Sequence, residues 1–232
     1  MSRAAIARAL GLTDPNLALI DDAIRDAERS TSGEIAIAIT RESSDYSFRE
    51  LFFSALLGAA AFAALLPFHS AVARAVDRAF WHHPDWYVTA FHGIVLLATT
   101  GIAFAFANLP AIDRIIVPRR ERSRAVYARA MRHFAESGVY ATREGTGILV
   151  FISLLEREVR IVADSGISRL IPQSEWDDIA GSLARGIKER RSAQAIVETV
   201  TRCGSLLARH FPPVGDNPNE LQDGIVFLEA GQ

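Results

Sequence analysis

The sequence predicts one α/β domain that is interrupted by a two-helix transmembrane hairpin. Two apolar runs, Leu51 to Phe68 and Tyr87 to Leu109, contain no Asp, Glu, Lys or Arg. A helix and a strand are predicted before these runs, and they are too few to bury their own apolar faces. We therefore expect this opening segment to join a sheet that is built after residue 147, with both flanks on one side of the membrane.

The two apolar runs are typical of membrane helices. A helix needs roughly 20 apolar residues to cross a hydrocarbon core of about 30 Å, and the second run meets that length, whereas the first is at the short end. The alternative is a buried hairpin in a soluble core, but such helices usually carry a polar stripe, which neither run has. Small residues spaced four apart would let the helices approach closely. They are Ser54 and Gly58, Ala55, Ala59 and Ala63, and Gly101 and Ala105.

The residues around the hairpin predict its orientation. An aromatic and histidine cluster between the runs suits the headgroup region: Phe80, Trp81, His82, His83, Trp86 and Tyr87. His92 is expected to reach the interface near a helix end. Arginines gather outside the runs, at Arg41, Arg49, Arg114, Arg119, Arg120, Arg122 and Arg124, while only Arg74 and Arg78 lie in the connection. By the positive-inside rule we expect a multi-pass inner-membrane protein whose termini are both cytoplasmic.

Composition excludes some classes of function. The formal net charge of -2 gives no reason to expect a nucleic-acid partner, because the arginines after the second run have a membrane-flank explanation. A single cysteine, Cys203, allows no internal disulfide. The first residues lack an apolar region long enough for a cleavable signal. We expect a first helix and strand over residues 12–48, the hairpin over 49–112 and the rest of the domain over 113–232.

The elements of the domain follow from local patterns. Asp14 and Pro15 begin a helix that runs to about Arg29, because Asp caps orphan amides and Pro suits the first helical position. Glu34 to Thr40 alternates isoleucine with small residues, which is typical of a strand buried on both faces.

After the hairpin, a helix is expected from about Arg119 to Ser137, ended by Gly138. Two strands joined by a tight antiparallel turn, a turn at Asp164 to Gly166, two further helices and a short strand complete the prediction. These elements cover Gly147 to Leu154, Glu158 to Ala163, a helix after Pro172, Ser192 to about His210, and Ile225 to Leu228.

Three segments resemble the TPM domain family, most closely its bacterial membrane-associated branch, whose members often accompany LemA-type proteins. These segments are Ala23 to Ile39 (AIRDAERSTSGEIAIAI), Arg143 to Ile167 (REGTGILVFISLLEREVRIVADSGI) and Leu206 to Leu221 (LLARHFPPVGDNPNEL). The resemblance implies a three-layer α/β/α sandwich. It also implies weak acid phosphatase activity, binding of a divalent cation, or a role in the upkeep of membrane complexes. Many members face an extracytoplasmic space, unlike the placement that the arginines predict here.

The resemblance places the candidate site at the loop after the central hairpin. Asp164 and Glu34 are the expected ligands of a divalent cation, calcium or magnesium, since such ions prefer oxygen ligands. Gly166, Arg160, Asp177 and Asp178 are further candidates. Each also has an ordinary interpretation. Asp164 would bond its own backbone in a turn, Glu34 would be an exposed strand end, Asp177 and Asp178 would complement a helix dipole, and Arg160 would be solvated.

Two functions of different class remain open. The first is a membrane-tethered interaction or maintenance module, which contacts the lipid bilayer and a membrane-protein partner. The second is a weak metal-dependent or acid phosphatase centred on Asp164, with Arg157 or Arg160 supplying positive charge. We favour the first, because the sequence contains a tether and a fold but no complete catalytic constellation.

Overall fold

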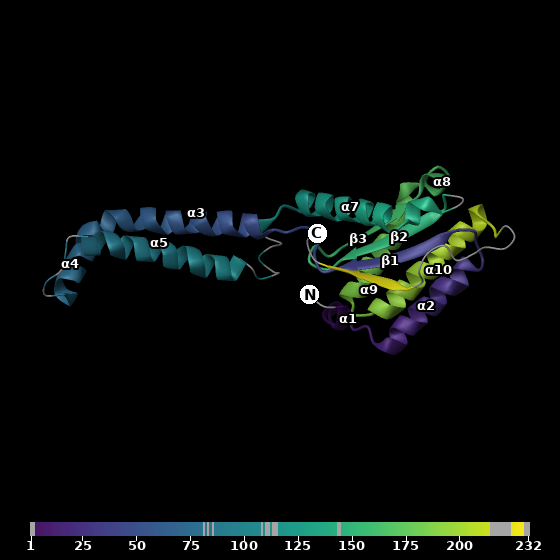
Figure 1. Ribbon diagram of the computed structural model, residues 1–232, viewed down its shortest axis with the longest axis horizontal. Helices are drawn as coiled ribbons and strands as arrows, with labels where there is room; N and C mark the ends of the chain where they lie inside the picture. The colour runs from purple at the N-terminus through teal and green to yellow at the C-terminus, as the bar shows by residue number, and fades with distance from the viewer. Residues whose placement is uncertain are drawn as a thin grey trace. The chain divides into compact units, whose positions relative to one another are not determined.

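In the computed structural model the chain forms two compact units (Figure 1). One comprises Met1–Asp45 and Arg120–Gln232, and the other comprises Tyr46–Arg119. The residues that the structure describes are 3–80, 82, 84, 86–107, 109, 112, 116–142, 145–213 and 224–229. The sequence-based expectations for Trp81, His83 and Arg114, and for the tail over 214–223, lie outside these residues.

The first unit is built on a four-stranded sheet with strand order β3-β2-β1-β4. Its strands are β1 (Glu34–Thr40), β2 (Gly147–Ser153), β3 (Glu158–Ala163) and β4 (Ile225–Leu228). β1 runs parallel to both β2 and β4, whereas β2 and β3 are antiparallel. The strand before the apolar runs therefore completes the sheet formed after them, as expected, and the predicted β-hairpin is confirmed.

Four helices cover one face of this sheet (Figure 1). They are α1 (Arg3–Leu10), α2 (Asp14–Glu28), α9 (Gln173–Lys188) and α10 (Ser192–His210). The odd-numbered isoleucines of β1 point into the core between these helices and the sheet, together with Trp176 of α9. This is the larger of the two hydrophobic clusters of the domain.

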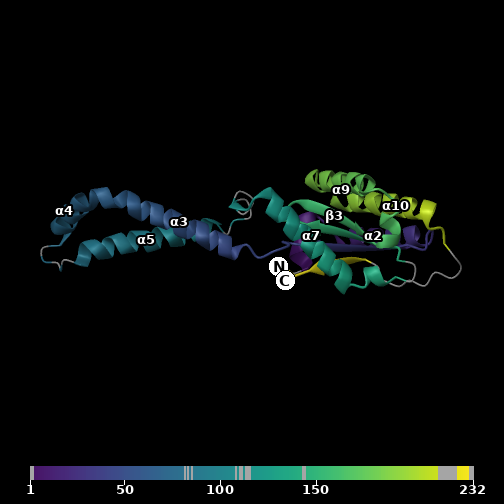
Figure 2. The ribbon, with the colours of Figure 1, turned by 90° about the horizontal axis from the view of Figure 1, so that it is seen from above.

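The opposite face is covered by α7 (Arg119–Glu136) and the short 3-10 helix η2 (Val139–Ala141). Val126, Ala130 and Phe134 of α7 pack there against Leu149 and Phe151 of β2. Figure 2 shows α7 on one side of the sheet and α9 and α10 on the other. The domain is thus a three-layer α/β/α sandwich.

The TSG segment before β1 has a packing explanation. A Cβ on Gly33 would lie 2.8 Å from Leu207 Cδ1 and 3.1 Å from the Thr146 carbonyl oxygen, so only glycine allows this approach. Thr31 Oγ1 donates to the carbonyl of Phe211 at 2.6 Å, and the Ser32 amide donates to the same oxygen at 3.1 Å. The motif therefore fastens the end of α10 to the start of β1.

The second unit is a helical hairpin with α3 (Ser47–Leu65), η1 (Leu66–Phe68), α4 (His69–Ala79) and α5 (Trp86–Ala107). By length and composition, two helical segments could cross a membrane: Ser47–Ala79 and Trp86–Ala107. The first apolar run, Leu51 to Phe68, is at the short end as expected, but the helix does not stop at Pro67, which occupies an early position of η1, where its missing amide costs nothing. The helical path therefore continues into α4, which the sequence analysis missed.

The helices of the hairpin meet at one of the expected small-residue pairs. A Cβ on Gly58 would lie 2.0 Å from Thr100 Oγ1, and Ser54 is fully buried. By contrast, Ala55, Ala59 and Ala63 are exposed, and a Cβ on Gly101 would meet nothing within 4 Å. Small residues were too frequent in these runs for spacing alone to identify the contact face.

His92 lies inside this hairpin instead of reaching outward. It is 4% exposed, and its Nδ1 lies 2.7 Å from the Val88 carbonyl oxygen. Its ring centroid is 5.4 Å from that of His69. The side chain thus packs inward beside His69, the first residue of α4, and its position relative to a membrane interface stays a prediction.

Candidate functional site

The two expected metal ligands lie at the same end of the sheet. Glu34 opens β1 and pairs with Gly147, the first residue of β2. The Asp164 amide, directly after β3, donates to the Gly147 carbonyl at 3.0 Å. Glu34, Gly147 and Asp164 therefore follow one another across three strands.

A backbone segment covers the middle of this row. A Cβ on Gly147 would lie only 2.1 Å from the carbonyl oxygen of Val139, so η2 packs directly onto that glycine. Glu34 is 2% exposed, which places its carboxylate in the interior and not at an exposed strand end as the ordinary interpretation had it. The covering segment therefore lies on Gly147, the residue that stands between the two acidic residues in this row.

Asp164 begins a short helix, α8 (Ser165–Ser168), where a simple turn was expected. Its Oδ1 accepts from the Ser165 amide at 2.5 Å, as an N-cap does. Its Oδ2 is buried, without a hydrogen-bond partner among the described residues. Gly145, whose φ of +63° favours glycine, would place a Cβ 3.6 Å from that oxygen. Asp164 thus has the backbone-capping geometry, with one carboxylate oxygen left over.

The remaining candidates are dispersed. Gly166 lies within α8. Arg160 is held on the α7 face, because its Nε donates to Glu158 Oε1 at 2.7 Å and its Nη2 to Ser123 Oγ at 2.6 Å. It is therefore engaged in joining β3 to α7 and is not simply solvated.

Asp177 and Asp178 are exposed on α9, which packs on the other face of the sheet. Gln173 Nε2 donates to Asp177 Oδ1 at 3.0 Å, and Asp178 Oδ2 lies 4.0 Å from Arg202 Nη2. Both aspartates take part in ordinary helix-surface contacts.

These residues do not assemble a cation site. Within the described part of the chain, no three His, Cys, Asp or Glu side chains are close enough together to hold a metal ion. Calcium takes six to eight oxygen ligands and magnesium about six. Asp164 and Glu34 alone fall short of that number, so cation binding stays a prediction that the described geometry does not support.

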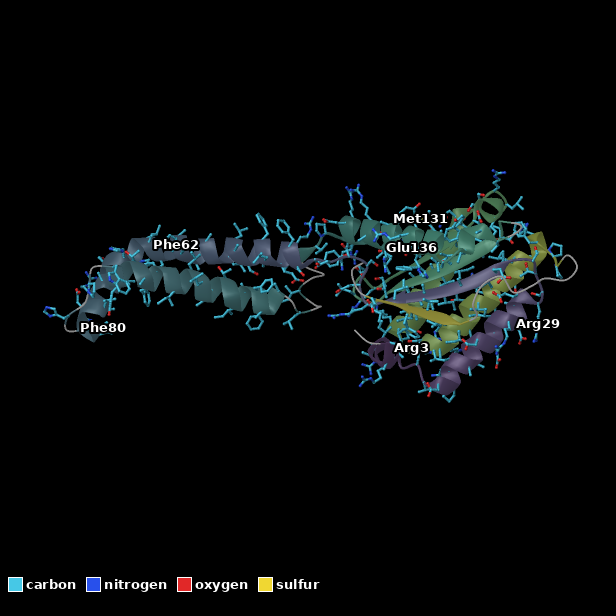
Figure 3. All side chains as sticks on the ribbon, viewed as in Figure 1. Arg3, Arg29, Phe62, Phe80, Met131 and Glu136 are labelled. Carbon is cyan, nitrogen blue, oxygen red and sulfur yellow. The ribbon has the colours of Figure 1, made fainter. Side chains whose placement is uncertain are left out.

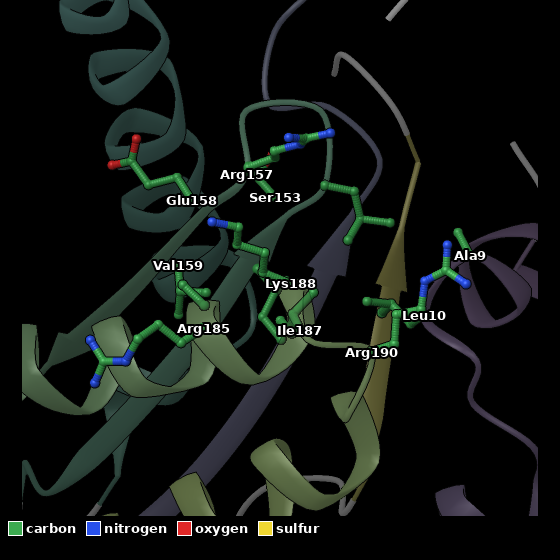
Figure 4. Close-up of a pocket in the computed structure, with 13 residues that line it drawn as sticks. Ala9, Leu10, Ser153, Arg157, Glu158, Val159, Arg185, Ile187, Lys188 and Arg190 are labelled. Carbon is green, nitrogen blue, oxygen red and sulfur yellow. The ribbon is translucent and has the colours of Figure 1, made fainter. Parts of the chain in front are cut away.

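A pocket of about 560 Å³ lies at the opposite end of the strands, on the face that carries α1 and α9 (Figure 4). Its lining comes from α1, the β2–β3 turn and the end of α9. Among the lining residues are the basic side chains Arg157, Arg185, Lys188 and Arg190. Of these residues, only Arg157 was predicted from the sequence, as a source of positive charge, and the other three were not. The KERR run over residues 188–191 was a visible signal, but basic residues at a helix end are also expected from the dipole alone.

A buried polar cluster ties the β2–β3 turn to the segment that follows β1. Glu156 Oε1 accepts from the Ser43 amide at 3.0 Å, and its Oε2 accepts from Ser153 Oγ at 2.5 Å. Ser43 Oγ in turn donates to Ser153 Oγ at 2.8 Å. All three residues are at most 7% exposed. We call this set the serine–glutamate cluster.

Burial shifts the pKa of His133 and Cys203, which lie in helices of the domain. Burial, aided by Arg129, lowers the pKa of His133 on α7 below its ordinary value of 6.5, although Glu136 opposes this. Burial raises the pKa of the Cys203 thiol on α10 to about 12. A thiol that stays protonated and inaccessible is chemically quiet, in agreement with a packing role.

Comparison with known proteins agrees with this architecture. Residues 102–206 match the family model described as "TPM domain", a segment that is somewhat under half of the chain. The NMR structure of the BA42 protein from the psychrophilic bacterium Bizionia argentinensis is similar in fold, with a TM-score of 0.54 and 19% sequence identity. That likeness covers 93% of this chain and 94% of the other. None of the curated proteins matches the sequence.

Proposed function

We propose that the α/β unit is anchored in the inner membrane and acts as an interaction or maintenance module. The match of residues 102–206 to the TPM domain model supports this proposal. The observation that carries the proposal is the apolar surface of the helical unit. Large side chains are exposed along α3 and α5, including Phe48 (79%), Leu97 (73%) and Phe52 (66%). Figure 3 shows these two helices bearing mostly carbon side chains.

Such a surface is costly in water and favourable in lipid. Removing one large apolar side chain from water contributes about 1.5–3 kcal/mol. Monomeric soluble proteins rarely expose contiguous apolar patches of more than a few hundred Å². The hydrocarbon core of a bilayer can surround the exposed apolar side chains of both helices together. This supports insertion of α3 and α5 in a bilayer.

The distribution of charge supports a cytoplasmic position for both flanks. Arginines lie before α3 and throughout the start of α7, whereas the connection between the helices carries Arg74 and Arg78 on α4. On this proposal α4 lies near the outer interface, with its basic side chains toward the headgroups.

The candidate catalytic residues take part in structural hydrogen bonds, which favours a binding role over phosphatase activity. A phosphatase needs an activated nucleophile and unengaged groups that neutralise developing charge. Asp164 caps α8, Arg160 is bonded to Glu158 and Ser123, and Arg157 lies at the opposite end of the strands from Asp164. We therefore propose a membrane-protein partner for the domain, and an Asp164-centred phosphatase is the weaker alternative.

Cysteine labelling tests the topology. Ala18→Cys and Arg169→Cys place thiols on exposed positions of the domain, and His82→Cys places one in the connection. Native Cys203 is buried, so the unmodified protein is the matched background control. In inverted inner-membrane vesicles, an impermeant maleimide should label positions 18 and 169 and spare position 82, and intact spheroplasts should give the opposite pattern.

Two outcomes would contradict the proposal. Labelling of positions 18 and 169 from opposite sides would show that the domain is not assembled on one side of the membrane. Recovery of the intact protein in the aqueous fraction without detergent would contradict the membrane anchor.

The role as an interaction module is tested by cross-linking in membranes. Failure to capture any partner, together with phosphatase turnover that is lost in Asp164→Asn, would favour the enzyme instead.

A further inference from the structure

We propose that the pocket between α1, the β2–β3 turn and the end of α9 binds the phosphate headgroup of an anionic phospholipid. Hydrocarbon next to the headgroup would rest on the apolar floor of the pocket. The inference rests on the proposed membrane anchoring for the source of the lipid. The chemistry of the pocket itself is independent of that anchoring.

The floor of the pocket is apolar. It is formed by side chains of α1, β2, β3 and α9: Leu10, Ile152, Leu154, Val159, Ala184 and Ile187. The volume of about 560 Å³ falls within the roughly 300–1,000 Å³ that is typical of small-molecule sites. A purely ionic ligand would leave this floor in contact with water, whereas an amphiphile covers it.

The rim of the pocket carries cations without internal counter-charges. The side chains of Arg157, Lys188 and Arg190 form no hydrogen bond or ion pair with any described residue. The acidic residue of the lining, Glu158, is already bonded to Arg160 and Ser123 on the other face of the sheet. Three positively charged residues, all of them exposed, thus line one pocket, and an anion is the complementary ligand.

Figure 4 shows that the fourth basic residue of the lining, Arg185, is oriented differently from these three cations. Arg157 lies on the turn, Lys188 lies centrally, and Arg190 lies beside Ala9 and Leu10. The guanidinium of Arg185 points away from them, and its Nη2 donates to Ser182 Oγ at 2.9 Å. Arg185 is therefore left out of the proposed site.

The backbone at two of the cations is unusual. Arg157 (φ 55°) and Arg190 (φ 61°) are the non-glycine residues with positive φ in the described part of the chain. Left-handed conformations favour Gly, Asn or Asp, so arginine is an unfavourable choice for stability at both positions. Residues held in such conformations concentrate at ligand sites, and here both line the same pocket.

The position of the pocket agrees with a membrane ligand. The β2–β3 turn that bears Arg157 is bonded to the end of β1, with the Leu154 amide donating to Thr40 O at 3.1 Å and the Leu155 amide to Arg41 O at 2.8 Å. From there the chain continues to the first apolar helix at Ser47. If the helices are anchored in lipid, this end of the sheet is the tethered end.

The test is a titration of the full chain in phosphatidylcholine nanodiscs with water-soluble dihexanoyl phosphatidate. Binding is measured by isothermal titration calorimetry for the unmodified protein, Arg157→Gln, Lys188→Gln and the charge-matched control Arg169→Gln, whose arginine is exposed on the domain outside the pocket. Each pocket variant should weaken binding by about tenfold or more, because it removes a charge-assisted hydrogen bond. The control should leave binding unchanged.

Parallel titrations separate the sources of the phosphate. Dihexanoyl phosphatidylcholine tests the need for net negative charge, and inorganic phosphate tests the need for the apolar body. Equal affinity for inorganic phosphate and phosphatidate, equal affinity for the neutral lipid, or an equal loss in Arg169→Gln would overturn the inference. Ala184→Phe, which fills the pocket without changing its charge, should also reduce phosphatidate binding, and unaltered binding would contradict the assigned place. None of these results depends on topology, so failure of the pocket and failure of the anchor are distinguishable.

Discussion

Replacement of Glu156 by alanine should destabilise the domain more than any other single change at the β2–β3 turn. Its carboxylate accepts from the buried Ser43 amide and from Ser153 Oγ. Each hydrogen bond to a charged group contributes about 1.5–3 kcal/mol, and a buried donor that loses its acceptor adds a desolvation cost. We expect Glu156→Ala to lower the free energy of unfolding by about 3–5 kcal/mol.

Glu156→Gln is the matched control. The Gln carbonyl can still accept from the Ser43 amide, and its NH₂ group can donate to Ser153 Oγ once that hydroxyl rotates. The side-chain volume is unchanged, so the loss should be only about 1 kcal/mol. The contrast between Ala and Gln therefore isolates the hydrogen bonds from packing.

The assay is urea titration of the full chain in detergent, followed by fluorescence of Trp176. This residue is 2% exposed within α9 and reports on the domain, and the other two tryptophans of the sequence, Trp81 and Trp86, give a background that the variants share. The midpoint should fall in Glu156→Ala at an unchanged urea slope. A loss below about 0.5 kcal/mol, or an equal loss in Glu156→Gln, would refute the reasoning from the serine–glutamate cluster.

Three further predictions follow from close contacts and burial. Burial lowers the pKa of His133 below 6.5, so the unfolded chain binds a proton more readily than the folded domain does. The urea midpoint should therefore drop as pH falls from 7.5 to 5.5. His133→Gln should reduce this drop, and an equal pH dependence of the midpoint in both proteins would contradict the prediction. Gly147→Ala drives a methyl to 2.1 Å from Val139 O and should cost at least about 2 kcal/mol by urea titration, and a neutral effect would show that η2 does not press on β2. Gly58→Ala should lower the thermal midpoint of the hairpin in detergent, whereas Gly101→Ala, which meets nothing within 4 Å, should not; equal effects would reject the α3–α5 contact.

The sequence predicted the domain well where periodicity and end signals agree. Asp14 and Pro15 marked the start of α2, and the alternating isoleucines marked β1. The antiparallel β2–β3 pair followed from a nearly continuous apolar segment, an alternating segment and the short link between them. These features are local, so one sequence suffices to identify them.

The features that could not be predicted from the sequence depend on contacts between distant segments, or on local sequence patterns that are compatible with more than one structure. The predicted first run ends at Phe68, yet Pro67 lies in η1 and the helical path continues beyond Phe68 into α4. Asp164 and Glu34 were brought to the same sheet end, but the cover provided by Val139 over Gly147 has no signature in either segment. Lys188 and Arg190 became pocket residues only through the approach of α1 and the β2–β3 turn.

The strand order also has a consequence for synthesis of the protein on the ribosome. β1 lies between β2 and β4, and its register partner Gly147 follows Glu34 by more than a hundred residues. At about 5–20 residues per second, translation leaves β1 with neither neighbour for roughly 5–20 s. During that delay both hydrogen-bonding edges of an isoleucine-rich segment are open. A nascent chain of this design needs a chaperone or another cover to keep that segment from pairing with another chain.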